Sequence, residues 1–226
     1  MTKLKLNGRS YGLPKRYTVD EWLQLARLDP SNAYDCTKIV SIGFRIPYWK
    51  LHDCDADSMI LGAGLVLHNA GTHRECKIKN LSSIKLGEFI DLDILLVGGV
   101  EKNLLDILKI LSEFPVTYAD EALYLVETYS HWRTSVYRQY AGLFDLNKES
   151  EADEEEEAWN PNEVARGWYK LLVDLADDDI LKLDSVADQS VYKAFTFLSL
   201  RKKKILEENF KQLEQKRKYD LQRNHK

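Results

Sequence analysis

The chain has 226 residues, of which 44% are hydrophobic and 30% are charged, a composition typical of a globular protein with its own core. No stretch approaches about 18 consecutive apolar residues, so we expect no membrane-spanning helix. The N-terminus is not an apolar run, so we expect no secretory signal. Three cysteines, Cys36, Cys54 and Cys76, do not suit a disulfide framework, and we expect free thiols in a reducing cytoplasm.

Charge is distributed unevenly along the chain, although the formal net charge is only −4. Six of the seven residues from Glu151 to Glu157 are acidic, whereas the stretch from Arg201 to Lys226 holds ten Lys or Arg against four Asp or Glu. Blocks of like charge are usually solvated, so residues 148–159 are predicted to form an acidic linker. The basic tail is the candidate site for an anionic partner.

The N-terminal region predicts a hairpin followed by two helices. Residues 4–11 alternate around Asn7-Gly8, a pair that favours a tight hairpin turn. Thr18 and Glu21 have the spacing of a capping box, which predicts a helix that Pro30 ends. A second helix is expected over residues 34–44, and Pro47 follows it.

The same order recurs further along the chain, which suggests an internal duplication. Residues 76–80 form a second candidate strand, residues 84–92 align with residues 17–25, and residues 104–115 align with residues 36–47. Each unit then consists of a strand, two helices and a proline, with unit boundaries at 1–75 and 76–147. Chance similarity between two amphipathic helix pairs is the alternative.

Further helices are expected after each unit and after the acidic linker. They cover residues 57–69, where Asp57 is the predicted cap, and residues 119–140. Asn160 and Pro161 mark the start of another helix in the C-terminal region 160–226, and a long charged helix is predicted from about Ser185. The predicted fold is mainly α (α+β), with one small β-hairpin or sheet.

The candidate chemical motifs are weak, so neither a metal nor a cofactor is expected. The Asp53 to Asp57 run resembles the opening of a calcium loop but lacks the glycine and glutamate that complete it. Cys54, His68, His73 and Cys76 have thiolate and imidazole ligands for zinc without the usual close spacing. Gly62-Ala63-Gly64 fits close helix packing better than a dinucleotide loop.

No nucleophile motif of a hydrolase is present, and no catalytic residue is predicted. An enzyme whose site is assembled from dispersed residues remains an alternative. The aromatic side chains instead favour a protein interface or a core, because they provide a large contact area at low entropic cost. The main ones are Trp22, Phe89, Trp132, Tyr137, Trp159 and Trp168.

The final helix offers two kinds of interaction surface. Arg201, Lys202, Lys203 and Lys204 form a basic cluster suited to phosphate, although Glu207, Glu208 and Glu214 interrupt it. Ile205, Phe210 and Leu213 are apolar anchors for a protein partner. A protein-docking helix is the preferred interpretation, and nucleic-acid binding is the alternative.

The phrases from Tyr17 to Leu23 and from Lys85 to Leu92 resemble the opening of small tail-assembly and baseplate-assembly proteins of tailed bacteriophages. The resemblance covers roughly residues 3–115, and this chain departs from it by carrying the phrase twice and by its acidic linker. It implies a non-enzymatic structural or assembly protein of a phage tail or baseplate. Its partners would be other tail or baseplate proteins, or further copies of itself, in the host cytoplasm or the virion.

Overall fold

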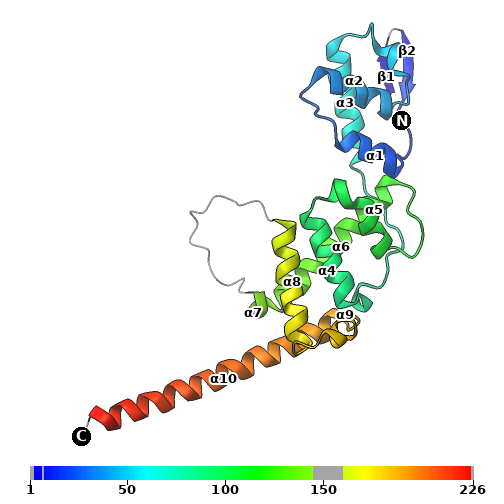
Figure 1. The fold of residues 1–226 in the computed structure, drawn as a ribbon. Coiled ribbons are helices and arrows are strands. Elements are labelled where there is room, and N and C mark those ends of the chain that lie inside the picture. Colours follow the sequence, from blue (N-terminus) through cyan, green and yellow to red (C-terminus); the bar gives the residue numbers. More distant parts are fainter. Residues whose placement is uncertain (1–2, 7, 145–159, 225–226) are drawn as a thin grey trace. The chain divides into compact units, whose positions relative to one another are not determined.

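The computed structural model describes residues 3–6, 8–144 and 160–224 of the chain. Helices dominate it, and one two-stranded antiparallel sheet stands at the N-terminus (Figure 1). The predicted mainly α fold is therefore confirmed. The predicted acidic linker, residues 148–159, and Trp159 within it, lie outside the described residues.

The chain divides into two compact units, each discontinuous in sequence. Unit 1 comprises Met1–Lys79 and Gly98–Ser130, and unit 2 comprises Asn80–Val97 and His131–Lys226. The predicted second repeat, residues 76–147, contributes to both units. Helix α6 (Ala119–Gln139) also contributes to both, since its first part belongs to unit 1 and its last part to unit 2.

Unit 1 begins with the predicted hairpin, formed by β1 (Lys3–Leu6) and β2 (Arg9–Gly12). Gly8 in the turn has a φ of 75°, a backbone conformation that glycine adopts without steric cost. The register places Leu4 opposite Tyr11 and Leu6 opposite Arg9. Leu4 and Leu6 are buried, so the hairpin contributes one apolar face to the core of unit 1.

The helices of unit 1 are α1 (Val19–Ala26), α2 (Ala33–Gly43), α3 (Ala56–Ala70), α5 (Val100–Leu111) and the first part of α6, with a short 3-10 turn at Tyr48–Leu51. The capping box of Thr18 and Glu21 is present as predicted. Asp55 caps α3, so the prediction that Asp57 is the cap is wrong. The Asp55 carboxylate accepts the Ser58 N–H from the position before the helix, whereas Asp57 lies in the first turn.

Helices α2 and α3 approach closely because glycine faces the contact. A Cβ atom on Gly43 would lie 2.2 Å from a methyl carbon of Val66, and one on Gly62 would lie 2.8 Å from methyl carbons of Leu4 and Val40. Real Cβ atoms do not occupy such positions without displacing a neighbour. The packing role predicted for the Gly62 region is therefore confirmed for Gly62 itself.

The predicted strand at residues 76–80 is not formed. The segment has no regular secondary structure, and Lys79 N–H donates to the carbonyl of Leu111, in the last turn of α5. A little earlier, Arg74 N–H donates to the carbonyl of Asp120 in α6. Helix carbonyls thus accept these two N–H groups, which in a sheet would donate to a neighbouring strand.

Unit 2 contains α4 (Leu86–Val97), the last part of α6, α7 (Ala141–Phe144), α8 (Pro161–Leu175), α9 (Leu183–Ala187) and α10 (Val191–Asn224). Two 3-10 turns, Leu81–Ser83 and Ile180–Lys182, complete it. Asn160 caps α8 and Pro161 opens it, as predicted. The expected single helix from Ser185 is wrong, because residues 188–190 interrupt it between α9 and α10.

The interruption before α10 places Ser190 in an antiparallel bridge with Lys85. Leu86 N–H donates to Gln189 O at 2.7 Å, so the start of α4 is tied to the start of α10. Unit 1 contains an equivalent antiparallel bridge between Thr18 and Tyr118. There the starts of α1 and α6 are tied together.

Phe89 of α4 lies at the centre of the core of unit 2. Its fully buried ring contacts Trp132, Tyr137, Trp168 and Phe195, with ring centroids 5.7–5.9 Å apart. Most of these contacts are edge-to-face, the arrangement that aromatic quadrupoles favour. Four of the aromatic residues that the sequence suggested for an interface or a core, Phe89, Trp132, Tyr137 and Trp168, therefore belong to this core.

The predicted equivalence of residues 17–47 and 84–115 holds for secondary structure, because each segment contains a helix pair. The packing differs between the two. Helices α1 and α2 both belong to unit 1, whereas α4 belongs to unit 2 and α5 to unit 1. Trp22 is half-buried against the core of unit 1, and its expected counterpart Phe89 is fully buried.

Candidate functional site

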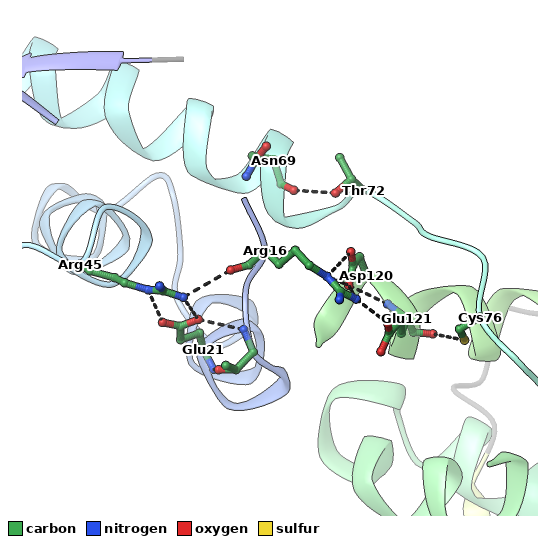
Figure 2. A network of polar contacts seen from close by, with 9 residues as sticks. Arg16, Glu21, Arg45, Asn69, Thr72, Cys76, Asp120 and Glu121 are labelled. Atoms are coloured by element: carbon green, nitrogen blue, oxygen red, sulfur yellow. Dashed lines mark hydrogen bonds and ion pairs between the residues drawn. The ribbon is translucent and has the colours of Figure 1, made fainter. Parts of the chain in front are cut away.

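A network of charged residues joins three segments of unit 1 (Figure 2). Arg16 contacts two carboxylates at the start of α6. Its Nε donates to Asp120 Oδ2 at 2.8 Å, and its Nη2 lies 2.7 Å from Glu121 Oε1. The guanidinium also stacks over the ring of Tyr118, 3.7 Å from the ring centroid. Figure 2 shows Arg16 reaching across from the segment before α1 to the start of α6.

A second arginine extends the same network to the end of α2. Arg45 donates through Nε and Nη2 to the two carboxylate oxygens of Glu21, at 2.8 and 3.0 Å (Figure 2). Its Nη2 also donates to the carbonyl of Arg16 at 3.3 Å. Arg45 has a φ of 53°, a left-handed conformation that stops α2 and allows the side chain to turn back toward α1.

The ion pairs of Arg16 with Asp120 and Glu121, and of Arg45 with Glu21, are called the polar clasp below. Its electrostatics are those of a structural element. Hydrogen bonding to Asp120 raises the pKa of Arg16, despite partial desolvation. Burial favours a raised pKa for Glu21, but the hydrogen bonds from Arg45 and Thr18 outweigh it and leave that pKa lowered. Burial also raises the pKa of Cys76, whose thiol contacts the carbonyl of Glu121 and is a weak nucleophile. The charges are paired with one another, so the arrangement fastens α1, α2 and α6 together.

The residues considered for a metal site lie in different environments. His68 is exposed in the last turn of α3, and His73 contacts Glu127, with Nδ1 2.5 Å from Oε2. Cys54 and Cys76 are half-buried cysteines that are not in a disulfide. Among the residues that the structure describes, no three His, Cys, Asp or Glu side chains are gathered to hold an ion.

Unit 2 contains an apolar cavity of about 740 Å³, and Asp93, Arg133 and Trp168 of its lining are hydrogen-bonded to one another. Asp93 of α4 is 3% exposed, and within the described part of the chain it is the one charged residue that is buried. It accepts hydrogen bonds from the Arg133 guanidinium and from Trp168 Nε1, the latter at 2.8 Å. Burial, with a smaller effect of the Asp93 charge, raises the pKa of Tyr137, which stays protonated. No sequence pattern pointed to Asp93, because it has the appearance of an ordinary helix carboxylate.

The C-terminal helix α10 presents the largest set of exposed apolar side chains. Its first turns are buried in unit 2 through Val191, Ala194 and Phe195. From Lys203 to Lys218 every side chain is exposed, including the predicted anchors Ile205, Phe210 and Leu213 at 48%, 62% and 59%. Leu206 is 59% exposed beside them and was missing from the predicted set. Figure 1 shows this part of α10, in orange to red, continuing beyond the elements that its first turns contact.

The basic cluster of α10 is partly used inside unit 2. Arg201 donates to the carbonyl of Asp174, in the last turn of α8, and Lys202 donates to the carbonyl of Gly142 in α7. Cations are favourable near helix C-termini, where carbonyl groups are unsatisfied. Lys204 lies 4.0 Å from Glu208 one turn further on. The structure therefore separates the predicted cluster, with Arg201 and Lys202 anchoring the helix and Lys203 and Lys204 on its exposed part.

No family model, curated protein or solved structure matches this chain. In the described ranges, no helix combines the length and the apolar character needed to cross a membrane.

Proposed function

We propose that the protein is a non-enzymatic assembly protein that binds other proteins through the exposed part of α10. One observation carries this proposal. Ile205, Leu206, Phe210 and Leu213 are large apolar side chains that are each about half or more exposed. Exposed apolar patches on soluble proteins usually mark interaction sites. An amphipathic helix that lies in a partner's groove uses anchors at this kind of spacing.

The resemblance to tail-assembly and baseplate-assembly proteins supplies the proposed context. In that context the partner is a phage tail or baseplate protein, and the chain acts in the host cytoplasm during assembly. The polar clasp of unit 1 and the buried Asp93 of unit 2 support the non-enzymatic part of the proposal. Their charged groups are matched to one another within the fold, which is how structural ion pairs are arranged.

The rival function is nucleic-acid binding through the basic cluster. Two of its four cations, Arg201 and Lys202, already donate to helix carbonyls of unit 2. Phosphate binding would rely on Lys203, Lys204 and the more distant cations of α10. This distribution favours the apolar anchors over the charges as the source of affinity.

The test compares two triple variants of the full chain. The apolar variant replaces Ile205, Phe210 and Leu213 with Ala. The charge variant replaces Lys203, Lys204 and Lys211 with Gln and leaves Arg201 and Lys202 in place, so that the anchoring of α10 is preserved. All six replaced side chains are exposed, so neither variant should alter the thermal unfolding midpoint.

Binding is measured to purified tail and baseplate proteins of the same phage and to a short DNA duplex, at low and high salt. We expect the apolar variant to weaken protein binding by at least about tenfold, equivalent to about 1.4 kcal/mol. The charge variant should change the rate of association more than the lifetime of the complex. Strong duplex binding that the charge variant abolishes, with no binding to tail proteins, would contradict the proposal.

A further inference from the structure

The two bridged helix pairs make α6 and α10 equivalent elements of the two units. In unit 1, Ala119 at the start of α6 donates its N–H to Tyr17 O at 2.9 Å, next to the start of α1. In unit 2, Val191 at the start of α10 donates its N–H to Ile84 O at 3.4 Å, next to the start of α4. Each bridge joins the residue before one helix to the residue before the other. The packing of the later residues of α6 therefore indicates how the later residues of α10 pack against a partner.

Beyond its bridge, α6 leaves the unit in which it starts and completes the core of the next. Its residues after Ser130 belong to unit 2. There Trp132 contacts the Phe89 ring at a centroid distance of 5.9 Å, and Tyr137 does so at the same distance. Tyr140, directly after the helix, contacts the Phe195 ring at 5.5 Å. These three residues follow each other at spacings of five and three.

The exposed part of α10 has the same spacing of large apolar residues, but these side chains do not pack against a core. Ile205, Phe210 and Leu213 also follow each other at spacings of five and three. They begin at nearly the same distance from the helix start as Trp132 does in α6. In α6 these positions are packed against aromatic rings, whereas in α10 the described side chains from Lys203 onward are all exposed.

We propose that Ile205, Phe210 and Leu213 of α10 insert into an aromatic-lined groove of a different protein, as α6 inserts into the core of unit 2, and that the rim of this groove is acidic. This inference rests on the proposed function, because it specifies the partner of the same docking helix. The partner is a helical domain that lacks one helix of its own core. Helix α10 supplies that helix.

Charge argues for the acidic rim and against a second copy of this chain. Residues 201–218 contain eight Lys or Arg and three Asp or Glu, so two such helices side by side would repel each other. In a second copy, the Phe89 ring of unit 2 is already contacted by Trp132 and Tyr137 of its own α6. Lys203, Lys211 and Lys216 remain around the anchors to meet carboxylates on the partner.

The first experiment identifies the occupant by cross-linking in the cells that naturally make the protein. The full chain carries benzoyl-phenylalanine in place of Phe210, and a matched control carries it in place of Gln215, on the opposite side of α10. We expect a cross-link to another protein from position 210 and none from position 215. The linked residues in that protein should lie among aromatic side chains flanked by Asp or Glu. Cross-links only to a second copy, only to nucleic acid, or to nothing would overturn the proposal.

The second experiment tests the equivalence with α6, using the purified cross-linked partner. In the graft variant, Ile205, Phe210 and Leu213 become Trp, Tyr and Tyr, the residues at positions 132, 137 and 140 in and directly after α6. In the polar variant the same positions become Lys, Asn and Gln. We expect the graft to stay within about tenfold of the original affinity, and the polar variant to lose at least about 100-fold.

The outcomes separate this inference from the proposed function. The apolar variant of the proposed function, with Ala at positions 205, 210 and 213, is measured alongside. If the graft variant binds as poorly as the polar variant and the apolar variant also loses affinity, α10 is a docking helix but not an equivalent of α6. The inference then fails and the proposed function stands. If all variants bind the partner as the original chain does, both fail. The altered side chains are exposed, so we expect each variant to keep its fold. Circular dichroism of each variant checks this.

Discussion

Replacing Asp93 with Ala should destabilise the protein by about 3 kcal/mol. The change removes the acceptor of two hydrogen bonds, a buried one from Trp168 Nε1 and a partly buried one from the Arg133 guanidinium. Losing one partner of a buried ion pair costs about 3–5 kcal/mol, and the lower end applies because the Arg133 side chain is 28% exposed. The stranded indole N–H of Trp168 adds to the loss, since that residue is only 7% exposed.

Thermal and urea unfolding, followed by circular dichroism and tryptophan fluorescence, measure this loss. A chain of this size should lose about 6–12 °C in its midpoint for about 3 kcal/mol. Asp106→Ala is the matched control, because that carboxylate is 60% exposed and pairs with Lys109 on the surface of α5. It should change stability by no more than about 0.5 kcal/mol. The double variant of Asp93→Ala with Arg133→Met should be more stable than Asp93→Ala alone. Equal effects of the Asp93 and Asp106 changes would refute the reasoning.

Three further predictions concern unit 1 and its comparison with unit 2. Gly62→Ala should lower the free energy of unfolding by about 1–3 kcal/mol, because its Cβ would meet Leu4 and Val40 at 2.8 Å. Gly64→Ala is the matched control and should be neutral or stabilise by up to about 1 kcal/mol, since nothing lies within 4 Å of its Cβ position. Urea unfolding of both variants checks this, and equal costs would contradict it. Phe89→Ala should cost about 3 kcal/mol or more and Trp22→Ala less, because only Phe89 is fully buried; the same assay would expose the reverse order. The pKa of Glu21 is lowered in the folded state, so its stabilising effect is complete above its ordinary pKa of 4.5 and is lost as pH falls through the lower folded value. Glu21→Gln should therefore unfold with a weaker pH dependence below about 4.5 than the original chain, and an unchanged pH profile would argue against the pair with Arg45.

The sequence predicted those features of the fold that neighbouring residues decide. The box of Thr18 with Glu21 and the Asn160-Pro161 start depend on atoms within one helical turn, so the pattern identified both. The hairpin depends on Gly8 and the alternation around it. The break at Ser190 was missed because its cause is a backbone bridge to Lys85, far away in the chain.

The site was predictable only in part for the same reason. Ile205, Phe210 and Leu213 were chosen from their helical spacing, and the structure shows that their side chains are exposed. Their role in binding a partner stays a prediction. The partners of Arg201 and Lys202 are backbone carbonyls of α8 and α7, and no residue type signals them in advance. Asp93 was missed because its partners, Arg133 and Trp168, come from two other helices.

The interleaving of the two units has a consequence for how the protein is made. During synthesis, Asn80–Val97 leaves the ribosome before any other part of unit 2 exists, and the chain then returns to unit 1 until Ser130. Phe89 must wait for Trp168 and Phe195, which are added much later, before its ring is covered on all sides. Incomplete chains therefore expose an apolar helix, α4, until Trp168 and Phe195 have been added, and such exposure favours aggregation. Unit 1 can close as soon as the first half of α6 emerges, so we expect it to fold first and to hold α6 ready for the core that follows.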